Sequence, residues 1–180
     1  AILAIGMTLV VSSSAGTDIS VGSVMSLYAG VCCMILAGYG NVNVSSYAHP
    51  LLVGILGGLA VTTICGLFNG LLVAYLNIQP MVATLILWSA GRAIGLLLCN
   101  SQIVYVRVPS FQKLGAYTGI IPTPIIVAVI CIAIAACVLK FTALGTYIQS
   151  VGINKKASRI AGFNSAKIIL LTYIICGLCA

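Results

Sequence analysis

The chain has 180 residues, of which 62% are hydrophobic and only 5% are charged. Ordinary soluble domains carry about 25% charged residues, so this composition excludes a soluble globular protein and indicates an integral membrane protein. The net charge of +7 comes from eight Lys and Arg residues against one acidic residue, Asp18. Such an excess would suggest nucleic-acid binding in a soluble protein, whereas in a membrane protein its placement indicates topology.

Four uncharged or nearly uncharged runs are long enough to cross a bilayer as helices, which takes about 20 residues. These runs are 19–37, 51–76, 81–99 and 123–139, and only Arg92 interrupts the third. Shorter apolar runs, 1–11 and 168–180, stand at the two ends without an initiator Met, which indicates a section of a longer protein. We expect an all-α, polytopic transmembrane bundle in which residues 1–180 form one domain.

The only acidic residue lies in the stretch AGTDIS, residues 15–20, after the first apolar run. Aspartate is a favoured N-cap, because its carboxylate accepts hydrogen bonds from the free N–H groups at a helix start. We therefore interpret Asp18 as the cap of a helix that begins at Ile19 or Ser20, at a break between two helical segments. At depth in a bilayer an Asp costs about 2.5–3.5 kcal/mol, so there it must face the protein interior or an aqueous cavity. Direct contact with a transported substrate is the alternative.

Small residues recur at every fourth position in the run 51–76 and in the runs on either side of it. The positions are Gly54, Gly58, Thr62, Gly66 and Gly70, with Gly22, Ser26 and Gly30 before them and Gly91 and Gly95 after them. Ridges of this kind let helix backbones approach closely in lipid. They predict a compact bundle, and they are equally compatible with receptors and membrane enzymes.

The basic residues predict the orientation of the chain. Five of them flank or lie within the segment 142–165, namely Lys140, Lys155, Lys156, Arg159 and Lys167. Only Arg107 and Lys113 lie in the preceding loop, 100–122. The positive-inside rule therefore places 142–165 in the cytoplasm. Threading backward puts 100–122 outside, 77–80 inside and 38–50, with His49, outside.

The segment 142–165 is too apolar for a loose linker, since Tyr147, Ile148, Val151, Ile160 and Phe163 stand among its charges. Residues 157–161 are predicted to form a short helix between Gly152 and Gly162. A short amphipathic helix on the cytoplasmic face is suited either to docking a partner or to lying on lipid headgroups.

Sequence patterns for catalysis or metal binding are missing. The eight cysteines lie within or at the edge of apolar runs, where cysteine usually acts as a small apolar side chain. One His and one acidic residue cannot form a His/carboxylate metal site or a Ser-His-Asp triad, and the sequence contains no GxxxxGK[ST] phosphate loop. We therefore predict no catalytic site, metal or cofactor in this section.

Three blocks of the sequence resemble permease subunits of ribose-type (simple sugar) ABC importers, within the branched-chain amino acid/ribose permease superfamily. AIGMTLVVSSSAGTDISVGSVMSL matches the family pattern at Gly16, Asp18, Ser20, Val21 and Gly22. GLFNGLLVAYLNIQPMVATLILWSAGRAI matches at Gly66, Asn69, Gly70, Pro80, Thr84, Leu85 and Arg92. ALGTYIQSVGINKKASRIAGFNSAKIILLTYIICGLCA is similar to the family's cytoplasmic coupling segment at Gly145, Gly152, Asn154, Ala157, Gly162 and Tyr173. The chain departs from the pattern at Ala15, Thr17, Ala93 and Lys155.

The resemblance implies a pore-forming, all-helical subunit of a type II-like importer, multi-pass in the bacterial inner membrane and surrounded by lipid. Two permease protomers would work with two cytoplasmic ATP-binding cassette ATPases and a periplasmic or extracellular sugar-binding protein. The chain itself would not be an enzyme; it would move sugar by alternating access when the ATPases close on ATP. The residues assigned to the translocation path or its helix break are Gly16, Thr17, Asp18, Ser20, Asn69, Thr84 and Arg92. Those assigned to ATPase coupling are Gly152, Asn154, Lys155, Ala157, Arg159, Ile160 and Gly162.

Two other functions stay open on the residues alone. A secondary transporter or channel coupled to H⁺ or Na⁺ usually needs acidic groups at depth, and this chain offers one Asp. A membrane enzyme with an intramembrane aspartate would normally need a second acid, which this section lacks. Copurification of an ATPase with the full-length protein would separate the importer from both.

Overall fold

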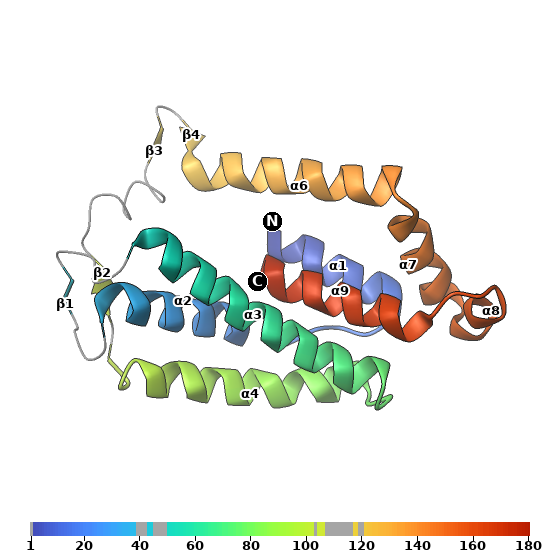
Figure 1. The fold of residues 1–180 in the computed structure, drawn as a ribbon, viewed down its shortest axis with the longest axis horizontal. Helices are drawn as coiled ribbons and strands as arrows, with labels where there is room; N and C mark the ends of the chain where they lie inside the picture. Colours follow the sequence, from blue (N-terminus) through green and yellow to red (C-terminus); the bar gives the residue numbers. More distant parts are fainter. Residues whose placement is uncertain (1, 39–42, 45–49, 103, 107–116, 119–120) are drawn as a thin grey trace.

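The apolar runs fold into helices in the computed structural model, which describes residues 2–38, 43–44, 50–102, 104–106, 117–118 and 121–180 (Figure 1). The helices are α1 (Ile2–Ser14), α2 (Val21–Ala37), α3 (Leu51–Ala74), α4 (Pro80–Leu98), α6 (Thr123–Phe141), α7 (Ala143–Ile153), α8 (Lys155–Ile160) and α9 (Ser165–Cys179). Two-residue strands β1 (Asn43–Val44) and β2 (Tyr105–Val106) pair in parallel, and β3 (Tyr117–Thr118) and β4 (Ile121–Pro122) pair antiparallel. Strands this short add no sheet layer, and the predicted all-α bundle is confirmed.

Three helices, α3, α4 and α6, are long and apolar enough to cross a membrane. Helices α1, α2 and α9 are apolar but shorter. The run 19–37, expected to span completely, is helical only from Val21, because Asp18 and Ser20 hold the preceding backbone in a turn. Helix α1 continues past the expected run 1–11 to Ser14, and α9 begins before the expected run 168–180.

Helix α3 packs between α9 and α2. A Cβ atom on Gly66 would lie 2.5 Å from the carbonyl oxygen of Tyr173, and one on Gly177 would lie 2.5 Å from that of Thr62. Helices α3 and α9 therefore touch backbone to backbone, as the small-residue ridge predicts. Gly22 differs from the prediction, since a Cβ there would meet no atom within 4 Å.

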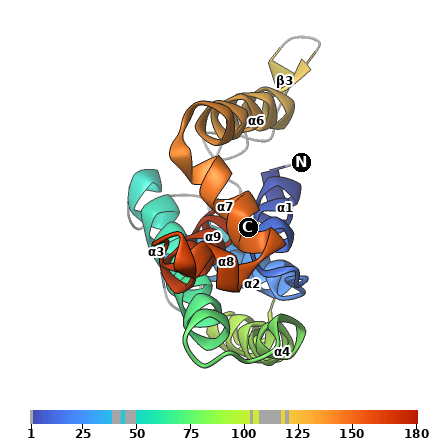
Figure 2. The same cartoon turned by 90° about the vertical axis from the view of Figure 1, so that its right-hand side faces the viewer.

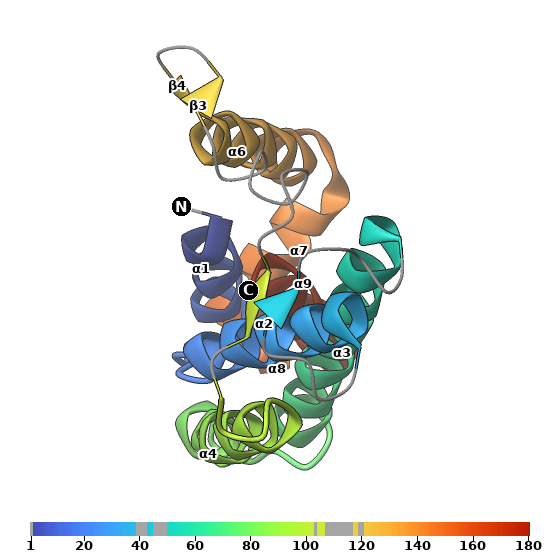
Figure 3. The ribbon, with the colours of Figure 1, turned by 90° about the vertical axis from the view of Figure 1, so that its left-hand side faces the viewer.

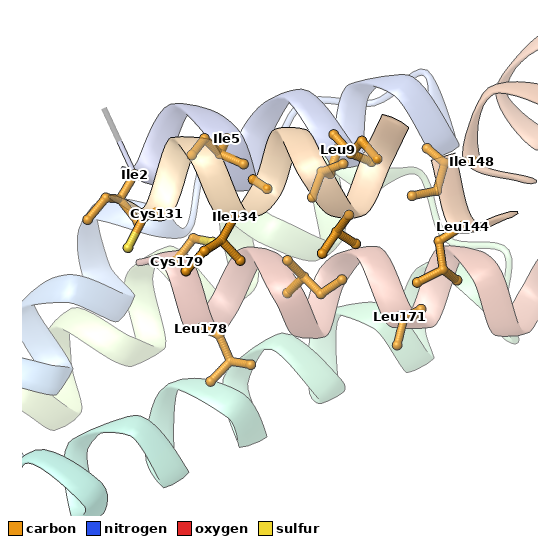
Figure 4. A pocket seen from close by; sticks show the side chains of 14 residues that line it. Ile2, Ile5, Leu9, Cys131, Ile134, Leu144, Ile148, Leu171, Leu178 and Cys179 are labelled. Carbon is orange, nitrogen blue, oxygen red and sulfur yellow. The ribbon is translucent and has the colours of Figure 1, made fainter. Parts of the chain in front are cut away.

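Helix α6 stands apart from the other helices (Figures 1 and 2). None of its residues is buried, and its strongest packing is against α7, which follows it in the chain. An apolar cavity of about 330 Å³ lies between α6, α7, α1 and α9. Figure 4 shows its walls, with Ile2 and Ile5 of α1, Cys131 and Ile134 of α6, and Leu171 of α9.

The two ends of the bundle carry different elements. The turn between α3 and α4 lies at the same end as α7 and α8, and β1 and β2 lie at the opposite end (Figure 1). Figure 3, viewed from that opposite end, shows β3 and β4 beyond the tip of α6. This grouping brings together the segments 77–80 and 142–165, both predicted to be cytoplasmic. The orientation stays a prediction, and His49, Arg107 and Lys113 lie outside the described residues.

Candidate functional site

The backbone between α1 and α2 is not helical, and it leads from one end of the bundle into its interior. Ala15 ends the helical path with a φ of 54°. Gly16 follows against the ring of Pro80, the first residue of α4, and a Cβ on Gly16 would overlap that ring. Further along, the N–H of Ile19 donates to Thr84 Oγ1 at 3.3 Å, one turn deeper in α4. Irregular backbone at membrane depth requires such internal partners, because lipid offers none.

Asp18 lies at the centre of this break, with 4% of its surface exposed. Its Oδ1 accepts hydrogen bonds from the Ser20 N–H at 2.8 Å and the Ser20 hydroxyl at 2.7 Å. Its Oδ2 accepts from the thiol of Cys176 in α9 at 3.6 Å. The described residues give Asp18 no cationic partner, so its charge is stabilised by these donors and by the nearby start of α2.

A second link joins the break to α3. The side-chain amide of Asn69, 1% exposed, donates from Nδ2 to Ser20 Oγ at 2.9 Å. Its other atom, Oδ1, is buried without a hydrogen-bond partner among the described residues. We call Asp18, Ser20, Asn69, Thr84 and Cys176 the Asp18 cluster. Asp18 and Ser20 belong to the α1–α2 break, and the other three residues come from α3, α4 and α9. The cluster therefore ties the break to these three helices.

The prediction that Asp18 caps a helix starting at Ile19 or Ser20 is wrong in its geometry. Helix α2 begins at Val21, Ser20 is its N-cap, and no side chain caps its first turn. Asp18 accepts instead from the N–H two residues ahead, the pattern of an Asx turn. The carboxylate therefore fixes the turn that precedes the helix.

The structure brings together five of the seven residues assigned to the path or break: Gly16, Asp18, Ser20, Asn69 and Thr84. Thr17 and Arg92 are exposed, and no contact with this cluster is seen for either. Asp18 is almost fully buried and lines a cavity of only about 10 Å³, which is room for about one water molecule. In this conformation Asp18 therefore positions the backbone of the break, and no larger solute fits beside it.

Sequence reasoning missed two contacts of this region. From the sequence, Cys176 was interpreted as a small apolar residue within a hydrophobic run. In the structure its thiol donates a hydrogen bond to Asp18, because α9 packs beside the break. The hydroxyls of Ser13 and Thr172 lie 2.8 Å apart, both fully buried, and bridge α1 to α9. A hydroxyl within an apolar run is the only signal for such a pair, and it does not identify the partner.

The segment 142–165, predicted to be a loop with one short helix, consists mainly of two helices at one end of the bundle (Figure 2). Asn154 separates them. Its backbone N–H donates to the carbonyl of Ser150 and ends α7, and its Oδ1 accepts from the N–H groups of Lys156 at 3.0 Å and Ala157 at 3.1 Å and starts α8. One residue therefore ends α7 and caps the start of α8.

The outer surface of this segment is apolar as well as basic. Ile153 is 87% exposed and Ile160 is 90% exposed, and Ala157 is also exposed. The rings of Tyr147 and Phe163 lie 4.6 Å apart and hold the end of α8 against α7. The segment is thus a braced element with unpartnered apolar side chains on its surface.

Two predicted features of this segment are corrected. The short helix spans Lys155–Ile160 and not 157–161, because Asn154 starts it earlier. Gly152 does not bracket it: Gly152 lies within α7, where a Cβ would overlap the carbonyl oxygen of Ser12 in α1. Gly162, with a φ of +89°, does follow the helix, and a left-handed residue there ends it.

Comparison with known proteins gives one family and several relatives. The family described as "Branched-chain amino acid transport system / permease component" matches residues 1–180. The galactofuranose transporter permease protein YtfT of Escherichia coli is 42% identical over 100% of this chain and 50% of its own length. The fructose import permease protein FruF of Bifidobacterium longum is 35% identical over 99% and 49%, and the ribose import permease protein RbsC of E. coli is 33% identical over 100% and 54%.

No solved structure matches this chain. The chain spans about half the length of the relatives it matches, so the missing half of each relative is not represented here. The match nevertheless covers both the Asp18 cluster and the segment 142–165. This multi-pass membrane chain belongs to the family of permease components of branched-chain amino acid transport systems.

Proposed function

We propose that this chain is part of the permease subunit of an ATP-binding cassette importer that carries a simple sugar across the bacterial inner membrane. A cytoplasmic ATPase, a sugar-binding protein outside and a second permease protomer complete the assembly. The observation that carries the proposal is the similarity, over nearly the whole chain, to permeases named for galactofuranose, fructose and ribose. The chain contributes the path and its coupling, and ATP is bound by the partner.

A continuous set of contacts supports a route from a cytoplasmic ATPase to the path. Helix α8 is fixed to α7 through Asn154. Gly152 of α7 touches the backbone of Ser12 near the end of α1, and α1 leads directly into the break that holds Asp18. Closely packed backbones cannot move independently, so a displacement of α8 would reach the Asp18 cluster.

The energy source tests this proposal against a secondary transporter. The full-length permease, purified in mild detergent, should retain an ATPase subunit. In proteoliposomes with the ATPase and the binding protein, sugar uptake should require ATP on the side of the membrane where the ATPase is bound. Uptake should continue when the H⁺ and Na⁺ gradients are collapsed. Uptake that depends on an ion gradient and is independent of ATP would establish a secondary transporter instead.

A further inference from the structure

A cavity of about 400 Å³ lies between the end of α3, helix α8 and the start of α9. Its lining includes Tyr75, Asn77, Lys155, Lys156, Arg159 and Asn164. The first two come from the turn after α3, which the sequence placed on the same side of the membrane as the segment 142–165 but not in contact with it. The cavity is therefore a composite surface made by two segments that are distant in the chain.

The cavity carries three cations and no acid. The chain has one acidic residue in all, Asp18, and Asp18 contacts Cys176 in the second half of α9. Ser165, at the other end of α9, lines the cavity; with a rise of about 1.5 Å per residue, about 16 Å of helix separates Ser165 from Cys176. No carboxylate of these 180 residues can therefore neutralise the three cations at close range.

The walls of the cavity are held in position. The hydroxyl of Ser165 donates to the carbonyl of Lys155 at 3.3 Å and ties α8 to α9. Val73 and Ile169, both buried, form part of an apolar floor. A preformed hollow with an apolar floor and a cationic rim favours an anionic group on a side chain, because the floor receives the methylene groups and the rim receives the charge.

We propose that this cavity receives a carboxylate side chain of the ATPase subunit, with Arg159 and Lys155 as its main partners. The proposal rests on the proposed function and deepens it, since it adds the end of α3 to the docking surface and gives the partner an acidic contact. Exposed Ile153 and Ile160 stand on the same segment, and apolar anchors beside a charged rim are the usual composition of a protein docking site. A lipid phosphate is the competing occupant.

Charge reversal in the full-length transporter tests the cavity. The double variant Lys155→Glu/Arg159→Glu should weaken ATPase binding by at least about tenfold at low salt, with a smaller loss at high salt, since it replaces attraction by repulsion. The double variant Lys140→Glu/Lys167→Glu, which makes the same change in net charge outside the cavity lining, should change binding by less than about twofold. Equal thermal melting of both variants will show that folding is intact, and Arg159→Gln gives a milder substitution if the double variant melts early.

The outcomes separate this inference from the proposed function. Loss of binding in the cavity variant alone supports an ATPase carboxylate. If Ala157→Trp detaches the ATPase but cavity charge reversal does not, docking stands and the cavity inference is overturned. If the cavity variant instead loses copurifying anionic phospholipid, measured by mass spectrometry, with ATPase binding unchanged, the occupant is a lipid. If no ATPase binds the unaltered permease, the proposed function fails first.

Discussion

Substitution of Asp18 separates a positioning role from a charge role in transport. Asp18→Leu removes the acceptor for the Ser20 N–H and hydroxyl, which lie 2.8 Å and 2.7 Å from Oδ1. Both donors are buried, and a buried donor left without an acceptor costs about 1–3 kcal/mol. The free energy of unfolding of the Leu variant should therefore fall by several kcal/mol, at about 2 kcal/mol for each of the two donors. Asp18→Asn keeps an oxygen at Oδ1 and loses the strengthening that charge gives, about 1 kcal/mol per bond. It also places an NH2 group where Oδ2 accepted the weak hydrogen bond from the Cys176 thiol.

The assay compares assembly and uptake in the full-length permease. The Leu variant should fail to assemble or melt early, whereas the Asn variant should assemble and retain partial sugar uptake. Thr17→Val is the matched control, because Thr17 is an exposed neighbour of Asp18 on the same break. If Asp18→Asn abolishes uptake while assembly and melting are unchanged, the charge itself acts in transport and the positioning account is refuted.

Two other predictions concern single contacts, and a third concerns topology. Gly66→Ile should destabilise the bundle by several kcal/mol, because a Cβ there meets the Tyr173 carbonyl oxygen at 2.5 Å. Thermal melting checks this against the control Gly22→Ala, a position where the space beside the helix is open. Equal melting temperatures of the two variants would contradict the close contact at Gly66. Asn154→Ala should cost about 0.5–2 kcal/mol of α8 stability and raise hydrogen exchange at Lys156 and Ala157; unchanged exchange would show that the cap is not needed. A cysteine introduced at His49 should react with an impermeant thiol reagent from outside, and one at Lys155 should not; the opposite pattern would invert the topology.

The sequence predicted the helices well and the contacts between them less well. Apolar runs of sufficient length identify α3, α4 and α6, because burial of the backbone in lipid leaves few other structures possible. The small-residue ridge at Gly66 identifies a close helix contact, but it does not say that α9 is the partner.

The Asp18 cluster shows where sequence reasoning stops. Asp18 and Ser20 are near neighbours, so a local hydrogen bond between them was within reach, yet the choice between a helix cap and an Asx turn depends on where α2 begins. The contacts with Asn69 and Cys176 depend on tertiary packing and have no local signal. Helix α7 was not predicted, because the basic residues that follow it led us to interpret the whole segment 142–165 as a cytoplasmic loop.

The coupling function of α8 is tested most directly by Ala157→Trp in the full-length transporter. Ala157 is exposed on α8 beside Ile160, and an indole there would keep a partner from packing on the helix. The control is Ala143→Trp, an exposed alanine at the start of α7. We expect Ala157→Trp to insert normally but to lose sugar-stimulated ATP hydrolysis and uptake together, whereas Ala143→Trp should keep both. Unchanged hydrolysis and uptake in Ala157→Trp would contradict a coupling role for α8 and leave the segment 142–165 as a topology signal alone.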